Sequence, residues 1–274
     1  MRRFEGGAAY GLALALLFAF SGCGSERDHA EARPEASETA PSPAGAPRGA
    51  LPDTPEEKRV RIAAGELFAG CREAEAATCI ADELPGIRRS TDAFAIDRSE
   101  VTLAAYRACV EAGRCRAPDA GEGCNWSRSD RDEHPINCVD WDQAVAYCTW
   151  RGGRLPTEWE WERAARGTDG RRQPWGEEAA DCSRAVIDEG KGSACGEGDG
   201  TLPVGSRLAG ATPEGLVDLI GNVWEWTASS RDEGSTRVVR GGAYYVEPAH
   251  ARASFLLRFK PTGRAPFVGL RCAQ

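Results

Sequence analysis

The 274-residue chain is long enough for one large domain or two small ones. Its formal charge of −8 argues against nucleic acid as a partner, because phosphate binding needs a basic face. Eleven cysteines accompany a single methionine, and no CxxC pair occurs. Cysteines spread in this way are typical of disulfides formed in an oxidising compartment, and they disfavour a cytosolic metal protein.

The N-terminus has the pattern of an export signal. Arg2 and Arg3 precede an apolar run over residues 8–20, which is shorter than the roughly 20 residues that span a bilayer. Cys23 directly follows Ser-Gly and resembles the lipidated cysteine of a bacterial lipobox, although an ordinary signal peptide with a chance cysteine is the alternative. We predict a signal peptide over residues 1–22 and an exported chain that a lipid on Cys23 anchors to the membrane, on the periplasmic side or at the cell surface. Lipidation would also leave ten cysteines, an even number, for disulfides.

Residues 23–58 are rich in Ala, Pro, Glu, Ser and Gly and hold almost no large apolar side chain. Such a segment cannot bury enough surface to offset its ordering entropy, so we expect a disordered tether. The folded domain is predicted to cover residues 59–274.

Three helices are expected in this domain. The first runs over about residues 103–112, with Thr102 or Ser99 as its N-cap and a glycine as its stop. The second follows Asp140 and ends at the glycine pair 152–153, with Trp141, Ala144, Val145 and Cys148 on one buried face. The third follows Thr157, where Glu160 completes a capping box, and Gly167 closes it. Short strands are expected over residues 238–240 and 268–271, in an α+β domain with long irregular stretches held by disulfides or ions.

Several blocks of the sequence, in order, resemble the formylglycine-generating enzyme family, also called sulfatase-modifying factor. The blocks include residues 154–167 (RLPTEWEWERAARG), 221–226 (GNVWEW), 240–242 (RGG) and 269–272 (GLRC). The ordered set spans about residues 94–273. The resemblance implies a loop-rich α+β fold related to C-type lectin-like domains.

The catalytic cysteines of that family have no counterpart here. In catalytic members two cysteines after the Arg-Gly-Gly strand bind copper and activate oxygen. The corresponding positions are Val246 and Ala251, and no cysteine occurs between Cys195 and Cys272. Copper(I) needs soft sulfur ligands, so neither copper nor formylglycine generation by the known route is expected.

Two other metals come into question. Iron, as in relatives with histidine and carboxylate ligands, would rely on His134 and His250 and is not expected either. The resemblance implies a structural calcium site instead, because hard oxygen ligands from a tight turn suit calcium. Its ligands would be the side chains of Asp218 and Glu225 and the backbone carbonyls of Gly221 and Val223. The alternative is that Glu225 only hydrogen-bonds the turn.

The resemblance also implies a disulfide between Cys148 and Cys272. For the other eight cysteines we expect local pairing, one of many connectivities that the sequence allows. The expected local pairs are Cys71–Cys79, Cys109–Cys115, Cys124–Cys138 and Cys182–Cys195. We interpret the i, i+4 series Glu158, Glu162 and Arg166 as a structural ion-pair row on the third helix and not as a catalytic group. The tryptophans, between Trp126 and Trp226, are expected in the core.

An intact scaffold without its catalytic cysteines favours a non-classical member that binds a small ligand or a protein at the cell envelope. The expected pocket follows the Arg-Gly-Gly strand. Its residues are Tyr244, Tyr245, Glu247, His250, Arg252, Phe255 and Arg258. The alternative is a metal-dependent oxidoreductase that acts on an exported peptide or metabolite.

Overall fold

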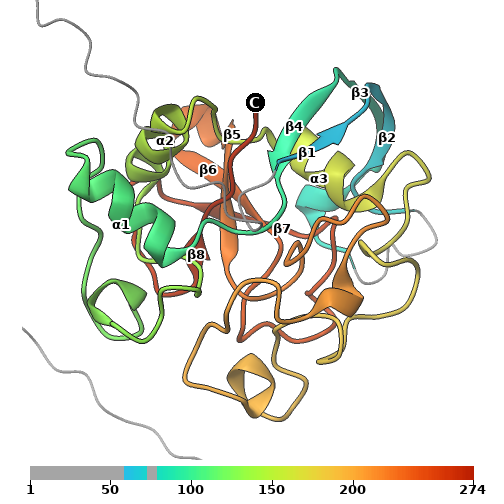
Figure 1. Ribbon diagram of the computed structural model, residues 1–274. Coiled ribbons are helices and arrows are strands. Elements are labelled where there is room, and N and C mark those ends of the chain that lie inside the picture. The colour runs from blue at the N-terminus through green and yellow to red at the C-terminus, as the bar shows by residue number, and fades with distance from the viewer. Residues whose placement is uncertain (1–58, 73–78) are drawn as a thin grey trace, which may run out of the picture. The chain divides into compact units, whose positions relative to one another are not determined.

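The computed structural model describes residues 59–72 and 79–274. The expected signal peptide, the tether and Cys23 lie outside the described residues. Within those ranges no helix is long and apolar enough to cross a bilayer. The described part combines three α-helices with three small sheets and long loops (Figure 1). This confirms the loop-rich α+β class.

Each α-helix begins at the residue that its capping pattern predicts. The helices are α1 (Leu103–Glu111), α2 (Trp141–Trp150) and α3 (Glu158–Arg166). Thr102, Asp140 and Thr157 accept a hydrogen bond from the backbone of the third residue of their helix, and α2 and α3 have complete capping boxes. Gly167 ends α3 with a φ of 63°, which glycine adopts at little cost.

The buried face of α2 differs from the prediction. Ala144 and Cys148 are buried as expected, but Tyr147 takes the place assigned to Trp141 and Val145, which are only half-buried. The indole Nε1 of Trp141 donates to the carbonyl of Thr227 (2.9 Å), and the Arg237 guanidinium lies 3.9 Å from its ring centroid. The half-buried Trp141 therefore packs its ring against the Arg237 cation.

Eight strands form the three sheets. The two-stranded sheets are antiparallel pairs of β1 (Arg59–Ile62) with β4 (Phe94–Asp97) and of β2 (Gly65–Ala69) with β3 (Ile87–Thr91). The four-stranded sheet has the order β7 (Leu256–Phe259), β6 (Thr236–Arg240), β5 (Trp224–Arg231), β8 (Val268–Gly269), with only β5–β8 parallel.

The structure contains both expected strands, but one of them is shorter than predicted. The strand over residues 238–240 is confirmed within β6. The strand over 268–271 is shorter than predicted. Its last residues leave the sheet because the carbonyls of Leu270 and Cys272 accept hydrogen bonds from the backbone of Val101 and Asp97 (2.9 and 2.8 Å). The remaining loops contain single turns of 3-10 helix: η3 (Ala81–Glu83), η4 (Asn125–Ser127), η5 (Ser193–Gly196), η6 (Leu208–Gly210) and η7 (Asp232–Gly234).

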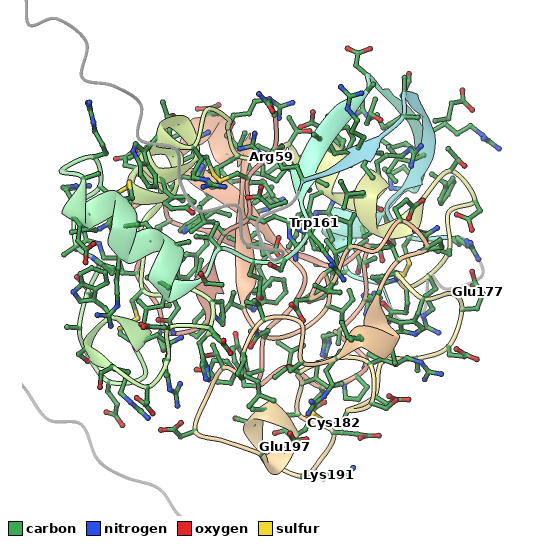
Figure 2. All side chains as sticks on the ribbon, in the orientation of Figure 1. Arg59, Trp161, Glu177, Cys182, Lys191 and Glu197 are labelled. Atoms are coloured by element: carbon green, nitrogen blue, oxygen red, sulfur yellow. A yellow bond between two sulfur atoms is a disulfide. The ribbon has the colours of Figure 1, made fainter. Side chains whose placement is uncertain are left out.

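The core is built partly of tryptophan, as predicted for Trp161, Trp224 and Trp226, which are fully buried. Figure 2 shows Trp161 in the interior, near the crossing of α3 and the central strands. Trp161 donates to Glu225 (2.6 Å) and Trp226 to the carbonyl of Val139 (3.0 Å), so these buried indole N–H groups are satisfied. The tryptophans at 126, 141, 150, 159 and 175 are half-buried.

A buried ion-pair network joins α3 to β6. Glu162 and Arg166 form the expected i, i+4 pair at 2.8 Å, and both side chains are almost fully buried. The other oxygen of Glu162 accepts from Arg240 (2.8 Å). The pairing of Glu158 is different from the prediction: it contacts Arg231 on β5 (2.5 Å) and Arg240 (3.7 Å). Only the Glu162–Arg166 pair therefore lies within α3, and the other ion pairs of these acids join α3 to β5 and β6.

All ten cysteines of the described residues form disulfides. The Cys148–Cys272 bridge, which connects residues 124 apart, joins α2 to the C-terminal segment. The four local bridges have the connectivity expected from the sequence. Five disulfides indicate that the chain folds in an oxidising, extracytoplasmic compartment.

Candidate functional site

Two glycines after β6 place the candidate site. Gly241 and Gly242 have φ values of 98° and 83°, which other residues rarely adopt. A Cβ on Gly241 would stand 3.0 Å from the carbonyl oxygen of Leu219, so this position is tightly enclosed. A Cβ on Gly242 would stand 3.8 Å from Val246 and 3.9 Å from the Cα of Ala251. The turn thus brings together the two positions that the resemblance assigns to the catalytic cysteines.

These two positions are buried, and the amide side chain of Gln173 lies beside them. Val246 is 7% exposed and Ala251 is fully buried. Their carbonyl oxygens accept hydrogen bonds from Asp188 (3.0 Å) and from the amide of Gln173 (2.7 Å). The side-chain oxygen of Gln173 is buried and has no hydrogen-bond partner among the described residues. No thiol is free there, because the described cysteines are all in disulfides.

An aromatic surface adjoins this turn. The rings of Tyr244 and Tyr245 meet edge to face at 5.7 Å, and Tyr245 contacts Phe267 at 5.1 Å. The ring of His250 lies 5.2 Å from that of Phe255. Tyr245, Glu247 and His250 are exposed and Tyr244 is half-buried, so a ligand can reach four of the residues expected to line the pocket.

Arg252 does not line an open pocket as we expected. It is 2% exposed, and its guanidinium donates to both carboxylate oxygens of the buried Glu83, which also accepts from the hydroxyl of Ser254 (2.7 Å). A guanidinium donates readily in this bidentate way to a carboxylate. Arg252 therefore connects the loop after β6 to η3 through Glu83.

Arg258 and Phe255 do not line an open pocket either. The Arg258 guanidinium is half-exposed and pairs with Asp82 (2.8 Å) and Asp232 (2.6 Å). Phe255 is 7% exposed and presents its ring to Trp224 at 5.9 Å. The sequence placed these three residues in the pocket because they follow the same turn, but the ion-pair partners of the two arginines come from distant segments.

The two histidines do not form a metal site with a carboxylate. His134 is half-buried and its Nδ1 lies 3.0 Å from the hydroxyl of Thr201. Within residues 59–72 and 79–274, only Cys71, Cys79 and Glu83 bring three potential ligand atoms within 4.8 Å of one another, and these two cysteines are disulfide-bonded.

A second polar centre surrounds Arg271. Glu225 accepts two hydrogen bonds from Arg271, both at 2.7 Å, in addition to the one from Trp161. Asp218 accepts from the backbone of Gly205 (2.6 Å). The sequence reasoning missed Glu100, which accepts from the side chain of Asn222 (2.6 Å) and the backbone of Val223 (3.1 Å). Its signal was its place in a family-like motif, residues 100–102, next to the buried strand β4.

This centre holds more negative than positive charge. Glu100, Asp218 and Glu225 are each less than a tenth exposed, and the buried cation Arg271 pairs with Glu225 and acts on the other two through its charge. Burial raises the pKa of Glu100 well above its usual value, and the charges of Asp218 and Glu225 raise it further. Burial likewise raises the pKa of Asp218 to about 6. When all three carboxylates are ionised, two negative charges have no buried counter-ion in this group.

Comparison with known proteins identifies the family. The profile of the sulfatase-modifying factor enzyme 1-like domain matches residues 47–274. The chain therefore belongs to the sulfatase-modifying factor family.

Relatives include active and inactive proteins. The chain is 35% identical over 189 residues to the formylglycine-generating enzyme of Thermomonospora curvata, covering 56% of this chain and 60% of that one. It is 40% identical over 155 residues to the inactive C-alpha-formylglycine-generating enzyme 2 of Bos taurus, covering 52% and 50%. The match thus spans only 50–60% of the length of these two relatives.

The solved structure of PvdO from Pseudomonas aeruginosa has the same fold. It superimposes with a TM-score of 0.69 at 23% identity, over 84% of this chain and 99% of that one. At this identity the likeness concerns the fold alone.

Proposed function

We propose that this chain is an exported, lipid-anchored family member that binds a ligand or a partner protein and does not generate formylglycine through copper. The binding surface is the exposed part of the turn after β6, formed by Tyr244, Tyr245, Glu247 and His250. Phe255 packs against His250, and Arg252 packs against Phe255, so both lie beside this surface, whereas Arg258 pairs with Asp82 and Asp232. The relation to an inactive mammalian family member at 40% identity is in line with this proposal.

One observation carries the proposal. Val246 and Ala251 lie together beside Gly242, where the resemblance places the copper-binding cysteines. Neither side chain can ligate a metal or exchange with a substrate thiol. The described part of the chain offers no thiol nearby to replace them, since its cysteines are all in disulfides.

The described domain begins at the end opposite the η5 loop, next to which the proposed binding surface lies. Arg59, where the described domain begins, donates to the side chain of the C-terminal Gln274 (2.8 Å). Tyr244 is held next to η5, because its carbonyl accepts from Ala194 (2.8 Å). Figure 2 shows Arg59 in the upper part of the domain and Cys182, Lys191 and Glu197 of the η5 loop at its lower end. When a detergent extract is separated into two phases, a lipid-anchored chain is expected in the detergent phase. Recovery of the full chain in the aqueous phase would contradict the anchor.

Metal analysis tests the loss of the catalytic centre. After loading with copper(I), the full chain purified from detergent-solubilised membranes is expected to hold well under one copper per chain and to leave a sulfatase-derived cysteine peptide unoxidised. The Val246→Cys/Ala251→Cys variant is expected to bind about one copper, because two thiolates side by side suit the ion. Val246→Cys alone is the matched control and should hold less.

Three other results would contradict or redirect the proposed function. One copper per wild-type chain, or conversion of the peptide cysteine to an aldehyde, would overturn the proposal. Stoichiometric iron in the wild-type protein would favour the alternative function, a metal-dependent oxidoreductase acting on an exported peptide or metabolite.

We further propose a structural calcium ion at the Asp218–Glu225 turn. The donors are the carboxylates of Asp218 and Glu225 and the carbonyls of Gly221 and Val223, which are hard oxygen ligands. The two unbalanced negative charges of this buried centre fit a divalent cation. Glu225 keeps an acceptor position for it, because its Oε1 accepts one hydrogen bond from Arg271 whereas Oε2 accepts two bonds.

Calcium is expected to stabilise the chain most at neutral pH. Without metal, the raised pKa values of Glu100 and Asp218 favour the protonated folded state at acid pH, and the contribution of Asp218 is lost as the pH rises through about 6. At pH 7.5, calcium at 100 times its Kd should raise the free energy of unfolding by about 2.7 kcal/mol. The same calcium concentration should raise it clearly less at pH 5, because protons compete for the ligands. Thermal unfolding with calcium or a chelator measures this. Asp218→Asn should weaken the calcium effect, and an equal effect of calcium at both pH values would contradict the site.

A further inference from the structure

A fixed guanidinium lies next to the proposed binding surface. The side chain of Arg131 is 8% exposed, and its Nη1 donates to the side-chain oxygen of Asn125 (3.0 Å). Asn125 is fully buried and in turn donates to the carbonyl of Pro135 (2.8 Å) and the hydroxyl of Thr201 (2.9 Å). The guanidinium is thus held in one orientation before any ligand arrives.

The outward side of this guanidinium meets a carboxylate of the same chain. Nη2 of Arg131 donates to one oxygen of Asp199, and Nη1 of Arg128 donates to the other (3.3 Å). The Asp199 side chain is itself 70% exposed. The charge of Arg131 is the main reason why the pKa of Asp199 lies below its usual value. A carboxylate therefore bridges two arginines at a place open to solvent.

The backbone around Asp199 allows this side chain to move away from Arg131 and Arg128. Glycines flank it at positions 198 and 200, and Gly200 has a φ of 149°. Ion pairs with one partner in solvent contribute little to stability, so the Asp199 side chain is held only weakly although Thr201 and Leu202 next to it are anchored by Asn125 and Asn222. Displacement of Asp199 would leave the guanidinium groups of Arg131 and Arg128 facing outward.

Tyr244 connects this place to the proposed surface. A Cβ on Gly200 would stand 3.7 Å from Nη1 of Arg131 and 3.9 Å from Cζ of Tyr244, so the guanidinium and the phenol flank the same glycine. Tyr244 also contacts the exposed Tyr245. A ligand lying on the two tyrosines could therefore extend an acidic group to Arg131.

We propose that Arg131 and Arg128, beside Tyr244, form a binding site for the carboxylate group of a ligand, and that Asp199 occupies this site as an internal competitor in its absence. The inference rests on the proposed function and names the chemical class that the surface recognises. Asp199 itself demonstrates the geometry, since its two oxygens are shared between the two arginines.

The charges favour a carboxylate over a phosphate. Arg128 donates twice to Asp130, both at 3.0 Å, and is thereby already neutralised. Only the charge of Arg131 then remains for the ligand, which matches the single charge of a carboxylate. A phosphate dianion would bring more negative charge than the site offsets.

Titration with benzoate tests the inference, because this probe joins a carboxylate to a ring that can contact the tyrosines. The full chain is labelled with 15N, and the amide signals of Gly198, Gly200 and Thr201 are followed. Asp199→Ala is expected to bind benzoate about tenfold more tightly than wild type, the factor that applies if Asp199 fills the site nine-tenths of the time. Glu197→Ala is the matched control, because it removes an exposed acid of the same loop that pairs with Arg207 instead.

The second variant locates the effect. Asp199→Ala/Arg131→Lys keeps the charge but loses the fixed fork of donors, so it is expected to lose most of the gained affinity. Equal affinities of Asp199→Ala and Glu197→Ala would overturn the inference, as would a gain that persists without Arg131. Tighter binding of inorganic phosphate than of benzoate to Asp199→Ala would overturn the carboxylate class. Since benzoate binding is independent of copper content, a failure here is distinguishable from a failure of the proposed function.

Discussion

Replacing Glu162 by glutamine is expected to lower the free energy of unfolding by about 3–5 kcal/mol, the effect of removing one partner from a buried ion pair. The carboxylate accepts from Arg166 and Arg240, each at 2.8 Å, and from the backbone of Gly70 (2.7 Å). All three side chains are almost fully buried. The variant would remove the acid that pairs with Arg166 and would leave Arg240 with Glu158 at 3.7 Å, although Glu158 already pairs with Arg231.

Urea denaturation at pH 7 measures this loss as a lower transition midpoint at an unchanged m-value. Glu66→Gln serves as the control, because Glu66 pairs with Arg88 (3.5 Å) where both side chains are more than two-thirds exposed. This exposed pair should contribute at most about 1 kcal/mol. If the two variants lost equal stability, the buried network would not hold α3 against β6 in the way described.

Removing the Cys148–Cys272 disulfide, as Cys148→Ala/Cys272→Ala, is expected to cost about 4–5 kcal/mol through the entropy of the unfolded chain. The bridge connects residues 124 apart, and loop-closure entropy rises with the length of the closed loop. Both cysteines are fully buried, so the lost sulfur contacts add to the effect.

The short bridge Cys109–Cys115 provides the comparison. Its residues are 6 apart, so the same reasoning assigns it about 2 kcal/mol. Guanidinium denaturation of both double-alanine variants against wild type tests the ranking. A larger loss for the short loop would show that native packing, and not chain entropy, dominates the contribution of these bridges.

The candidate site could be predicted only in part. The family resemblance placed Val246 and Ala251 after the Arg-Gly-Gly strand and therefore indicated which residues are near them. The exposed residues Tyr245 and His250 follow directly from that placement. Arg252 could not be assigned, because its partner Glu83 is 169 residues away and nothing local distinguishes a ligand-binding arginine from one that is paired in the interior.

The same limit explains the missed strands. The β1–β4 pair joins Arg59 to Asp97, and β2 pairs with β3 across the Cys71–Cys79 bridge. These strands are only four or five residues long, and β3 holds three exposed residues in a row, so no clear alternation of apolar and polar residues marks it. Short strands acquire their stability from partners that the sequence does not specify.

Local chemistry in the sequence alone determined the starts of the three helices, because a cap residue binds a backbone N–H only three positions away. It also favoured the short-range disulfides, where neighbours in the chain meet readily, although it allowed other connectivities. The tertiary structure alone decided which charges are buried and paired: Arg240 with Glu162, Arg252 with Glu83, and Arg271 with Glu225. Such pairs form only where folding removes water from both groups, since an exposed pair of the same residues contributes little.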